Sequence, residues 1–236
     1  MKIKAGDILA VLYFLAYTGL VLFFPLEYVK GDGFYWCFSC DPMECLNDNF
    51  VSVVNQCPYI SGFLKVGLLA TFGEMLKMRG KTGSWKTPDL FPKFLVWGVY
   101  GMLFTIVFAL FGYGVGAVMG SPIWPLKFEN EMAQRIWQGF STSLWANLIF
   151  CFPMMLSHEY WNTCITKKRF LGGGEFLEAI DKHVWGSFML KSIVIFWIPA
   201  HTITFSLPKP FQVLMSAYLS LALGFILTIK PKKKAD

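Results

Sequence analysis

The chain has 236 residues, of which 55% are hydrophobic, 18% are aromatic and 15% are charged, and its mean hydropathy is +0.50. Soluble domains carry about 25% charged residues, so the composition argues against a soluble globular protein, and it equally excludes a disordered chain. The net charge of +6 does not indicate a nucleic acid partner, because the basic residues stand in short blocks beside apolar runs. The sequence predicts an integral membrane protein surrounded by membrane lipids.

Six apolar stretches set the expected fold. About 20 apolar helical residues cross a hydrocarbon core of about 30 Å. The stretches predict an all-α fold, a polytopic transmembrane helical bundle forming a single membrane domain over 1–236, with spans at about 8–26, 58–78, 94–117, 136–157, 184–206 and 210–229. The first run is too long for a signal-peptide core and lacks a small-residue cleavage site. We therefore expect it to remain as a span.

The basic residues predict the orientation of these spans. With six crossings and a cytoplasmic N-terminus, three basic residues fall outside, and fifteen fall on the cytoplasmic side in 1–7, 77–93, 167–182 and 230–236. Such a bias follows the positive-inside rule. Both termini are therefore expected in the cytoplasm, and 27–57 is expected to be an external loop.

This external loop contains four of the six cysteines, namely Cys37, Cys40, Cys45 and Cys57. Thiols outside the cytoplasm are commonly oxidised, so the first interpretation is two disulfides with three possible pairings. The alternative is a four-thiolate zinc site, since Cys37 and Cys40 have ligand-like spacing, although the second pair lacks it. We expect disulfides, with no metal and no cofactor.

Glu74 is an ionisable residue within the second expected span. Charge inside a membrane is costly unless it is paired or hydrated. Glu74 lies three residues before Lys77, so the two can pair on one helix face. A structural ion pair and a place on a solute pathway both remain open for Glu74.

Gly112, Gly116 and Gly120 follow one another at steps of four near the outer end of the third expected helix. Glycines four residues apart form a ridge that permits close helix packing. We expect this ridge to pack against another helix, and it also suits association of a second copy into a homo-oligomer.

The fourth expected helix carries a stripe of small and polar residues. They recur at steps of three or four, which places them on one helix face: Gly139, Ser143, Asn147, Cys151, Met154 and His158. Such a face either packs against a neighbouring helix or lines a wet cavity. The pair His158-Glu159 begins like a zincin motif, but Asn162 stands where the second His is required.

The segment from Phe196 to Pro208, at the end of the fifth expected span, resembles the C-terminal signature of the Mpv17/PMP22 family, roughly W-P-x-x-Q-x-x-N-F. Trp197 and Phe205 keep the spacing, His201 falls at the Gln position and Thr204 at the Asn position. The resemblance covers about 60–230. It implies a small integral membrane protein, and some family members form weakly selective channels.

The sequence and this resemblance together predict a small channel or permeation pathway for ions or small solutes. The residues expected to line it are Glu74, Asn147, His158, His201 and Thr204. The alternative is a structural or partner-binding membrane protein without transport. No complete catalytic constellation is visible, so an enzyme is not expected. The span number and the Cys-rich loop resemble a bacterial member, which implies the bacterial cytoplasmic (inner) membrane.

Overall fold

The computed structural model describes residues 4–38, 41–124 and 126–226. These residues are mostly helical, as expected, and divide into two compact units, 1–61 and 62–236. Five of the described helices are long and apolar enough to cross a membrane, in agreement with a multi-pass membrane protein.

The first unit contains one long helix and a small mixed segment. Helix α1 (Ala5–Phe23) is followed by strands β1 (Leu26–Val29) and β2 (Gly33–Trp36), and then by α2 (Pro42–Glu44), the π-helix η1 (Cys45–Val51) and α3 (Ser52–Gln56). The strands pair antiparallel, so the expected external loop contains a hairpin. Its turn uses Gly31 and Gly33 at positive φ, a conformation that glycine adopts without steric cost.

Side chains from η1 and α3 hold this hairpin in place. The backbone N–H of Tyr28 donates to Ser52 Oγ at 3.0 Å, and Asn49 Nδ2 donates to the carbonyl oxygen of Cys37 at 3.2 Å. Asn49 is almost completely buried, as are Tyr17 and Phe50. These residues form the small core of the unit.

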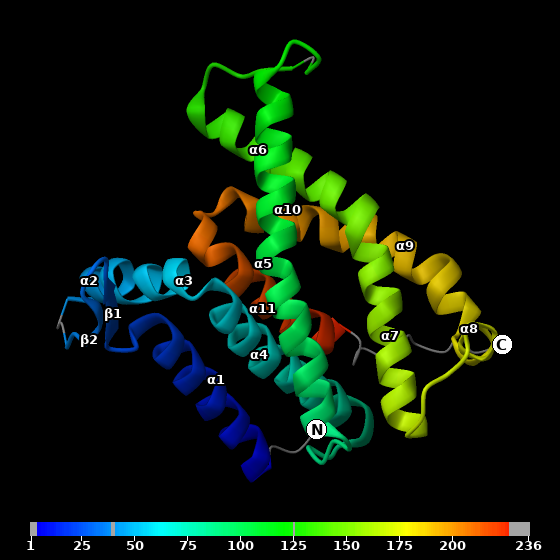
Figure 1. Cartoon of the computed structure of the whole chain (residues 1–236). Coiled ribbons are helices and arrows are strands. Elements are labelled where there is room, and N and C mark those ends of the chain that lie inside the picture. Colours follow the sequence, from blue (N-terminus) through cyan, green and yellow to red (C-terminus); the bar gives the residue numbers. More distant parts are fainter. Residues whose placement is uncertain (1–3, 39–40, 125, 227–236) are drawn as a thin grey trace. The chain divides into compact units, whose positions relative to one another are not determined.

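The second unit is a helical bundle. Its helices are α4 (Pro58–Thr82, whose first residues lie in the first unit), α5 (Leu90–Gly120), α6 (Glu131–Ala146), η2 (Asn147–Cys151), α7 (Phe152–Lys167), α8 (Gly173–Ala179), η3 (Val184–Phe188), α9 (Met189–Ser192), η4 (Ile193–Trp197), α10 (Ile198–Ser206) and α11 (Lys209–Ile226). Helices α6 and α10 pack along each other, and α5 crosses them (Figure 1).

The expected and observed spans differ at two places. The fourth is one helix of 37 residues, Glu131–Lys167, about 55 Å long, so it exceeds the 30 Å core that 136–157 was expected to cross. The sixth, 210–229, corresponds to α11, which is not among the five candidates, and 227–229 lie outside the described residues. The six-span topology and the cytoplasmic termini stay predictions.

Two π-helical turns interrupt the long helices just before prolines. Pro153 and Pro199 lack the N–H that would bond to the carbonyl groups of Ile149 and Ile195, and these two residues lie in η2 and η4. We attribute the π turns to these missing donors. A π turn adds one residue to a helical turn, so it rotates the following side chains by about 100° around the helix axis.

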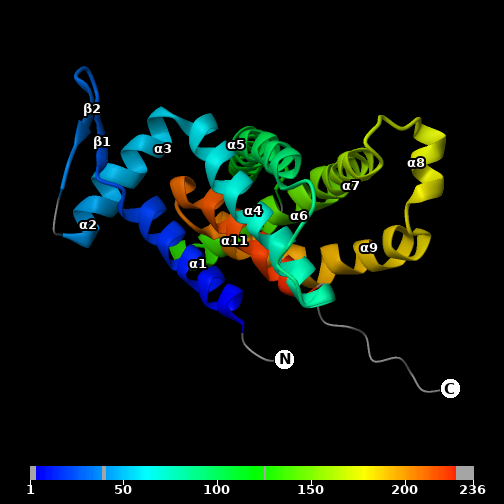
Figure 2. The same ribbon diagram turned by 90° about the horizontal axis from the view of Figure 1, so that it is seen from below.

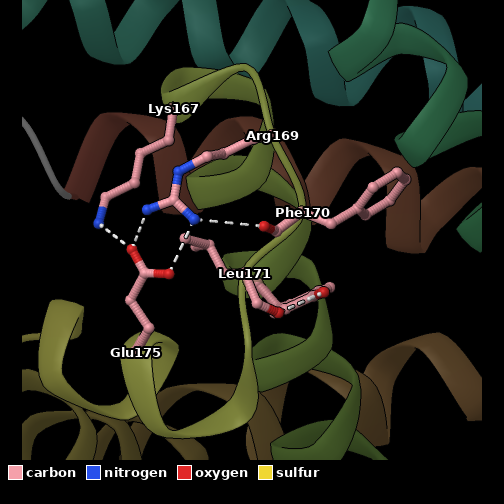
Figure 3. Close-up of polar contacts among 6 residues, drawn as sticks. Lys167, Arg169, Phe170, Leu171 and Glu175 are labelled. Carbon is pink, nitrogen blue, oxygen red and sulfur yellow. Dashed lines mark hydrogen bonds and ion pairs between the residues drawn. The ribbon is translucent and has the colours of Figure 1, made fainter.

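An ion cluster closes the connection after α7. Lys168 ends the helix with a left-handed conformation, and Arg169 forms a two-point hydrogen-bonded ion pair with Glu175 at the start of α8, which Lys167 Nζ joins at 3.4 Å (Figure 3). The hydrogen bonds from Arg169 hold the pKa of the Glu175 carboxyl below its usual range. Helix α8 itself begins at Gly173, directly after this connection.

Candidate functional site

A buried amide–imidazole pair connects the two π-interrupted helices. Asn147 is 1% exposed and lies at the first position of η2. Its Nδ2 donates to the carbonyl oxygen of Ser143 at 2.8 Å and lies 3.1 Å from Nδ1 of His201 in α10. The Asn147 Oδ1 atom is 3.3 Å from the same His201 nitrogen, so the direction of this hydrogen bond depends on the imidazole tautomer. The structure thus brings together two of the five expected pathway residues.

This pair borders a cavity of about 50 Å³ inside the second unit. Such a volume has room for about three water molecules. Hydrophobic side chains form most of its wall, and four polar residues, Asn147, His201, Ser216 and Ser220, complete it. The larger wall residues are Trp97, Phe104, Phe108, Phe150, Met154, Met155, Trp197 and Phe205. No charged residue is among the described residues that line the cavity, which suits small neutral solutes better than ions.

The rest of the polar stripe packs against α10 and η4. The buried Ser143 hydroxyl donates to the carbonyl oxygen of Ile198 at 2.7 Å. A Cβ added at Gly139 would lie 2.9 Å from the carbonyl oxygen of Thr202, so α6 and α10 can approach only because this residue is glycine. Cys151 belongs to a hydrophobic cluster with Trp197 and other apolar residues. Packing therefore accounts for Gly139 and Ser143, and the stripe residues that line the cavity are Asn147, Cys151 and Met154.

His158 lies apart from the Asn147–His201 pair. Its ring packs on Trp97 with 4.0 Å between centroids, and its Nδ1 is 3.5 Å from Asn162 Nδ2. Trp97 lines the cavity, whereas His158 does not. The rotation that η2 introduces separates His158 from the face that carries Asn147, because the spacing of four residues no longer holds across a π turn.

Thr204 and Glu74 also lie away from the cavity lining. Thr204 is fully buried, and its hydroxyl donates to the carbonyl oxygen of Ala200 one turn earlier in the same helix, at 3.1 Å. Glu74 and Lys77 form the expected ion pair, with 3.8 Å between Oε2 and Nζ. The predicted pairing of Glu74 with Lys77 is thus observed, and a place on a solute pathway stays a prediction for Glu74 and Thr204.

The glycine ridge of α5 is not the close helix contact that its spacing suggested. A Cβ added at Gly112 or Gly120 would meet no atom within 4 Å, and one at Gly116 would meet only Gln138. The close contact in α5 is at Gly101, whose backbone touches Gly62 of α4. The spacing of the glycines did not predict which of them makes a close contact, because that contact depends on the position of a second helix.

The described cysteines of the external loop form no disulfide, and the Cys57 thiol is free. The two predicted bridges, which also require Cys40 and Cys45, stay a prediction. Cys57 lies at the junction of α3 and α4, whereas Cys37 follows β2 and is tied to Asn49 through its carbonyl group. Cys40 and the Cys45 side chain lie outside the described residues. No group of three or more potential metal ligands occurs in the part of the chain that the structure describes.

Sequence reasoning missed several residues that form the cavity. Trp97 and Trp197 both line it, and their buried indole nitrogens have no hydrogen-bond partner among the described residues. Ser216 and Ser220 contribute from α11. Their spacing of four places the serines on one helix face, and this was the available signal.

Comparison with known proteins found no matching family model, curated protein or solved structure.

Proposed function

We propose that this chain is a multi-pass membrane protein, related to the Mpv17/PMP22 family and located in the bacterial inner membrane, that lets small polar solutes pass through its second unit. The observation that carries the proposal is the buried Asn147–His201 pair beside a cavity large enough for water. A polar solute that loses its hydration needs replacement hydrogen bonds inside a membrane. The amide and the imidazole supply donors and acceptors for that purpose.

The cavity favours neutral solutes among those the sequence suggested. A bare ion in a low-dielectric interior requires compensating charge or many oriented dipoles. The described residues around this cavity offer one amide, one imidazole and two serine hydroxyl groups. Small hydroxylated or amide-containing molecules match these groups, so we place them ahead of ions.

The test is a flux measurement with purified protein in liposomes, using glycerol and urea as neutral probes and potassium as the ion probe. The wild type should admit glycerol or urea faster than protein-free liposomes do. The variant Asn147→Leu removes the amide. Loss of this hydrogen-bonding group should cost about 1–3 kcal/mol, which corresponds to a decrease of about 5- to 160-fold in flux. His201→Gln keeps a hydrogen-bonding side chain, so we expect it to retain most of the flux.

Thr204→Val is the matched control. Thr204 is buried in the same helix as His201, but it does not line the cavity. Its variant should keep wild-type flux per folded molecule. A wild-type protein that admits none of the three probes faster than empty liposomes refutes the permeation proposal.

The second candidate function is a structural membrane protein that carries no solute. The contacts of Ser143 and Gly139 with α10 favour it, because they use the polar stripe for helix packing. Under this alternative, the wild type shows no solute flux, and Asn147→Leu only lowers the melting temperature. The homo-oligomer predicted from the α5 glycines stays a prediction, and Gly112 and Gly120 are unobstructed within the chain.

A further inference from the structure

The hairpin of the first unit has two chemically different faces. Its register pairs Leu26 with Trp36 and Tyr28 with Phe34, while Glu27 pairs with Tyr35. Side chains alternate between the faces of a strand. One face therefore carries Leu26, Tyr28, Phe34 and Trp36, and the other carries Glu27, Val29 and Tyr35.

Aromatic rings extend the first of these faces beyond the strands. Phe24 lies 5.8 Å from Trp36, and Trp36 stacks on Phe38 at 6.2 Å between centroids. A second contact, of 5.1 Å, joins Tyr28 to Phe34. We call the surface formed by Phe24, Leu26, Tyr28, Phe34, Trp36 and Phe38 the aromatic face.

The aromatic face is open in the structure. Trp36 is 66% exposed and Phe38 is 78% exposed, and Phe24 and Phe34 are also exposed. Exposed apolar patches of this kind mark a surface that meets a partner or a membrane. Figure 2 shows the hairpin projecting from α2 and α3 within its own unit.

The position of the hairpin in the chain selects the membrane as its partner. Helix α1 is a candidate span that ends at Phe23, and α4, the next candidate span, begins at Pro58. A segment that connects two consecutive spans lies on one side of the bilayer, and its first and last residues are both at that membrane surface. The aromatic face begins one residue after α1, so it lies at the depth where membrane proteins concentrate Trp and Tyr.

We propose that the aromatic face is an interfacial anchor that lies among the lipid headgroups beside the end of α1, with Glu27 and Tyr35 turned toward water. The segment 24–57 contains five acidic residues and one basic residue. Attraction to anionic lipid is therefore not its driving force, and a zwitterionic bilayer is sufficient. The inference rests on the membrane-spanning helices and not on the passage of solutes.

The experiment measures tryptophan quenching in phosphatidylcholine vesicles that contain the whole protein. Subtracting the emission of Trp36→Phe from that of the wild type isolates the Trp36 signal among nine tryptophans. Lipids brominated near the headgroup should quench this signal at least twice as strongly as lipids brominated near the chain end. Aqueous iodide should quench it weakly.

The double variant Trp36→Phe/Tyr35→Trp is the matched control, because it moves the indole by one residue to the opposite face. Its difference signal, taken against Trp36→Phe, should reverse the pattern, with strong quenching by iodide and weak quenching by brominated lipid. Circular dichroism and a monodisperse gel-filtration profile verify that each variant folds.

Strong iodide quenching of Trp36 itself, without quenching by brominated lipid, overturns the anchor and leaves the face open to a protein partner. Equal quenching at positions 35 and 36 overturns it as well, because the anchor requires two different faces. These outcomes are independent of flux, so a protein without transport activity can still have the anchor.

Discussion

Replacing Gly101 by Ala tests the packing of α4 against α5. A Cβ added at Gly62 would lie 2.6 Å from the carbonyl oxygen of Gly101, so the two backbones touch at this point. Gly112 lies in the same helix, and a Cβ there would meet no atom within 4 Å. The two positions allow the same substitution to be compared in one helix, once in a contact and once in open space.

The size of the effect follows from the overlap. A Cβ at Gly101 would clash with the carbonyl oxygen of Gly62, and it would lie 2.8 Å from the Cβ of Val66 and from the carbonyl carbon of Gly62, at least about 0.7 Å inside ordinary contact. None of these atoms can rotate away, so the helices must separate. Overpacked sites cost about 1–3 kcal/mol. We expect Gly101→Ala to lower the free energy of unfolding by about 2–3 kcal/mol, and Gly112→Ala to raise it by up to about 1 kcal/mol.

Thermal unfolding in detergent measures this difference. Cys151 and Cys164 are buried, so a thiol-reactive dye reports their exposure as the bundle opens. A change of 1 kcal/mol shifts the melting temperature of a chain of this size by about 2–4 °C, and the two variants should differ by about 4–16 °C. Equal melting temperatures for Gly101→Ala and Gly112→Ala would refute the close contact.

Three further predictions follow from other contacts. Ser143→Ala removes a buried hydroxyl that donates to an α10 carbonyl group, and it should lower the free energy of unfolding by about 1 kcal/mol, measured by thermal unfolding. His158→Ala removes a buried imidazole ring and should lower the free energy of unfolding by about 2–4 kcal/mol. Flux per folded molecule should stay unchanged, because the ring does not line the cavity. Arg169 lowers the pKa of Glu175, so the ion pair stabilises α8 above the ordinary carboxyl pKa of about 4.3, and this contribution is lost as pH falls through the lowered value. The protection factors of the α8 amides, which correct for the slower intrinsic exchange at low pH, should therefore fall with acidification in the wild type, and not in Glu175→Gln.

Each of these predictions has an outcome that contradicts it. An unchanged melting temperature in Ser143→Ala means that the hydroxyl does not hold α6 to α10. A loss of flux in His158→Ala, at wild-type folded yield, returns His158 to the solute pathway. Glu178→Gln is the control for the ion pair, since Glu178 is exposed in the same helix, and it should exchange as the wild type does at every pH.

Local properties of the sequence determined the helical fold and the membrane environment. An apolar run of about 20 residues partitions into lipid and satisfies its backbone there as a helix whatever its neighbours are. The pairing of Glu74 with Lys77 was likewise predictable, because residues three apart are neighbours on every helix. The four-residue steps from Gly139 to Asn147 predicted one shared face for the same reason.

The tertiary structure decided which helix that face meets and where the stripe ends. The partner of Ser143 lies 55 residues later in the chain, and no local pattern specifies the rotation of so distant a helix. The π turn η2 changes the direction of the side chains that follow Asn147. His158 therefore does not lie on the helix face from which Asn147 contacts His201. For the same reason the glycine contact falls at Gly101 and not at Gly112, because close approach depends on the path of α4 and not on the spacing of glycines in α5.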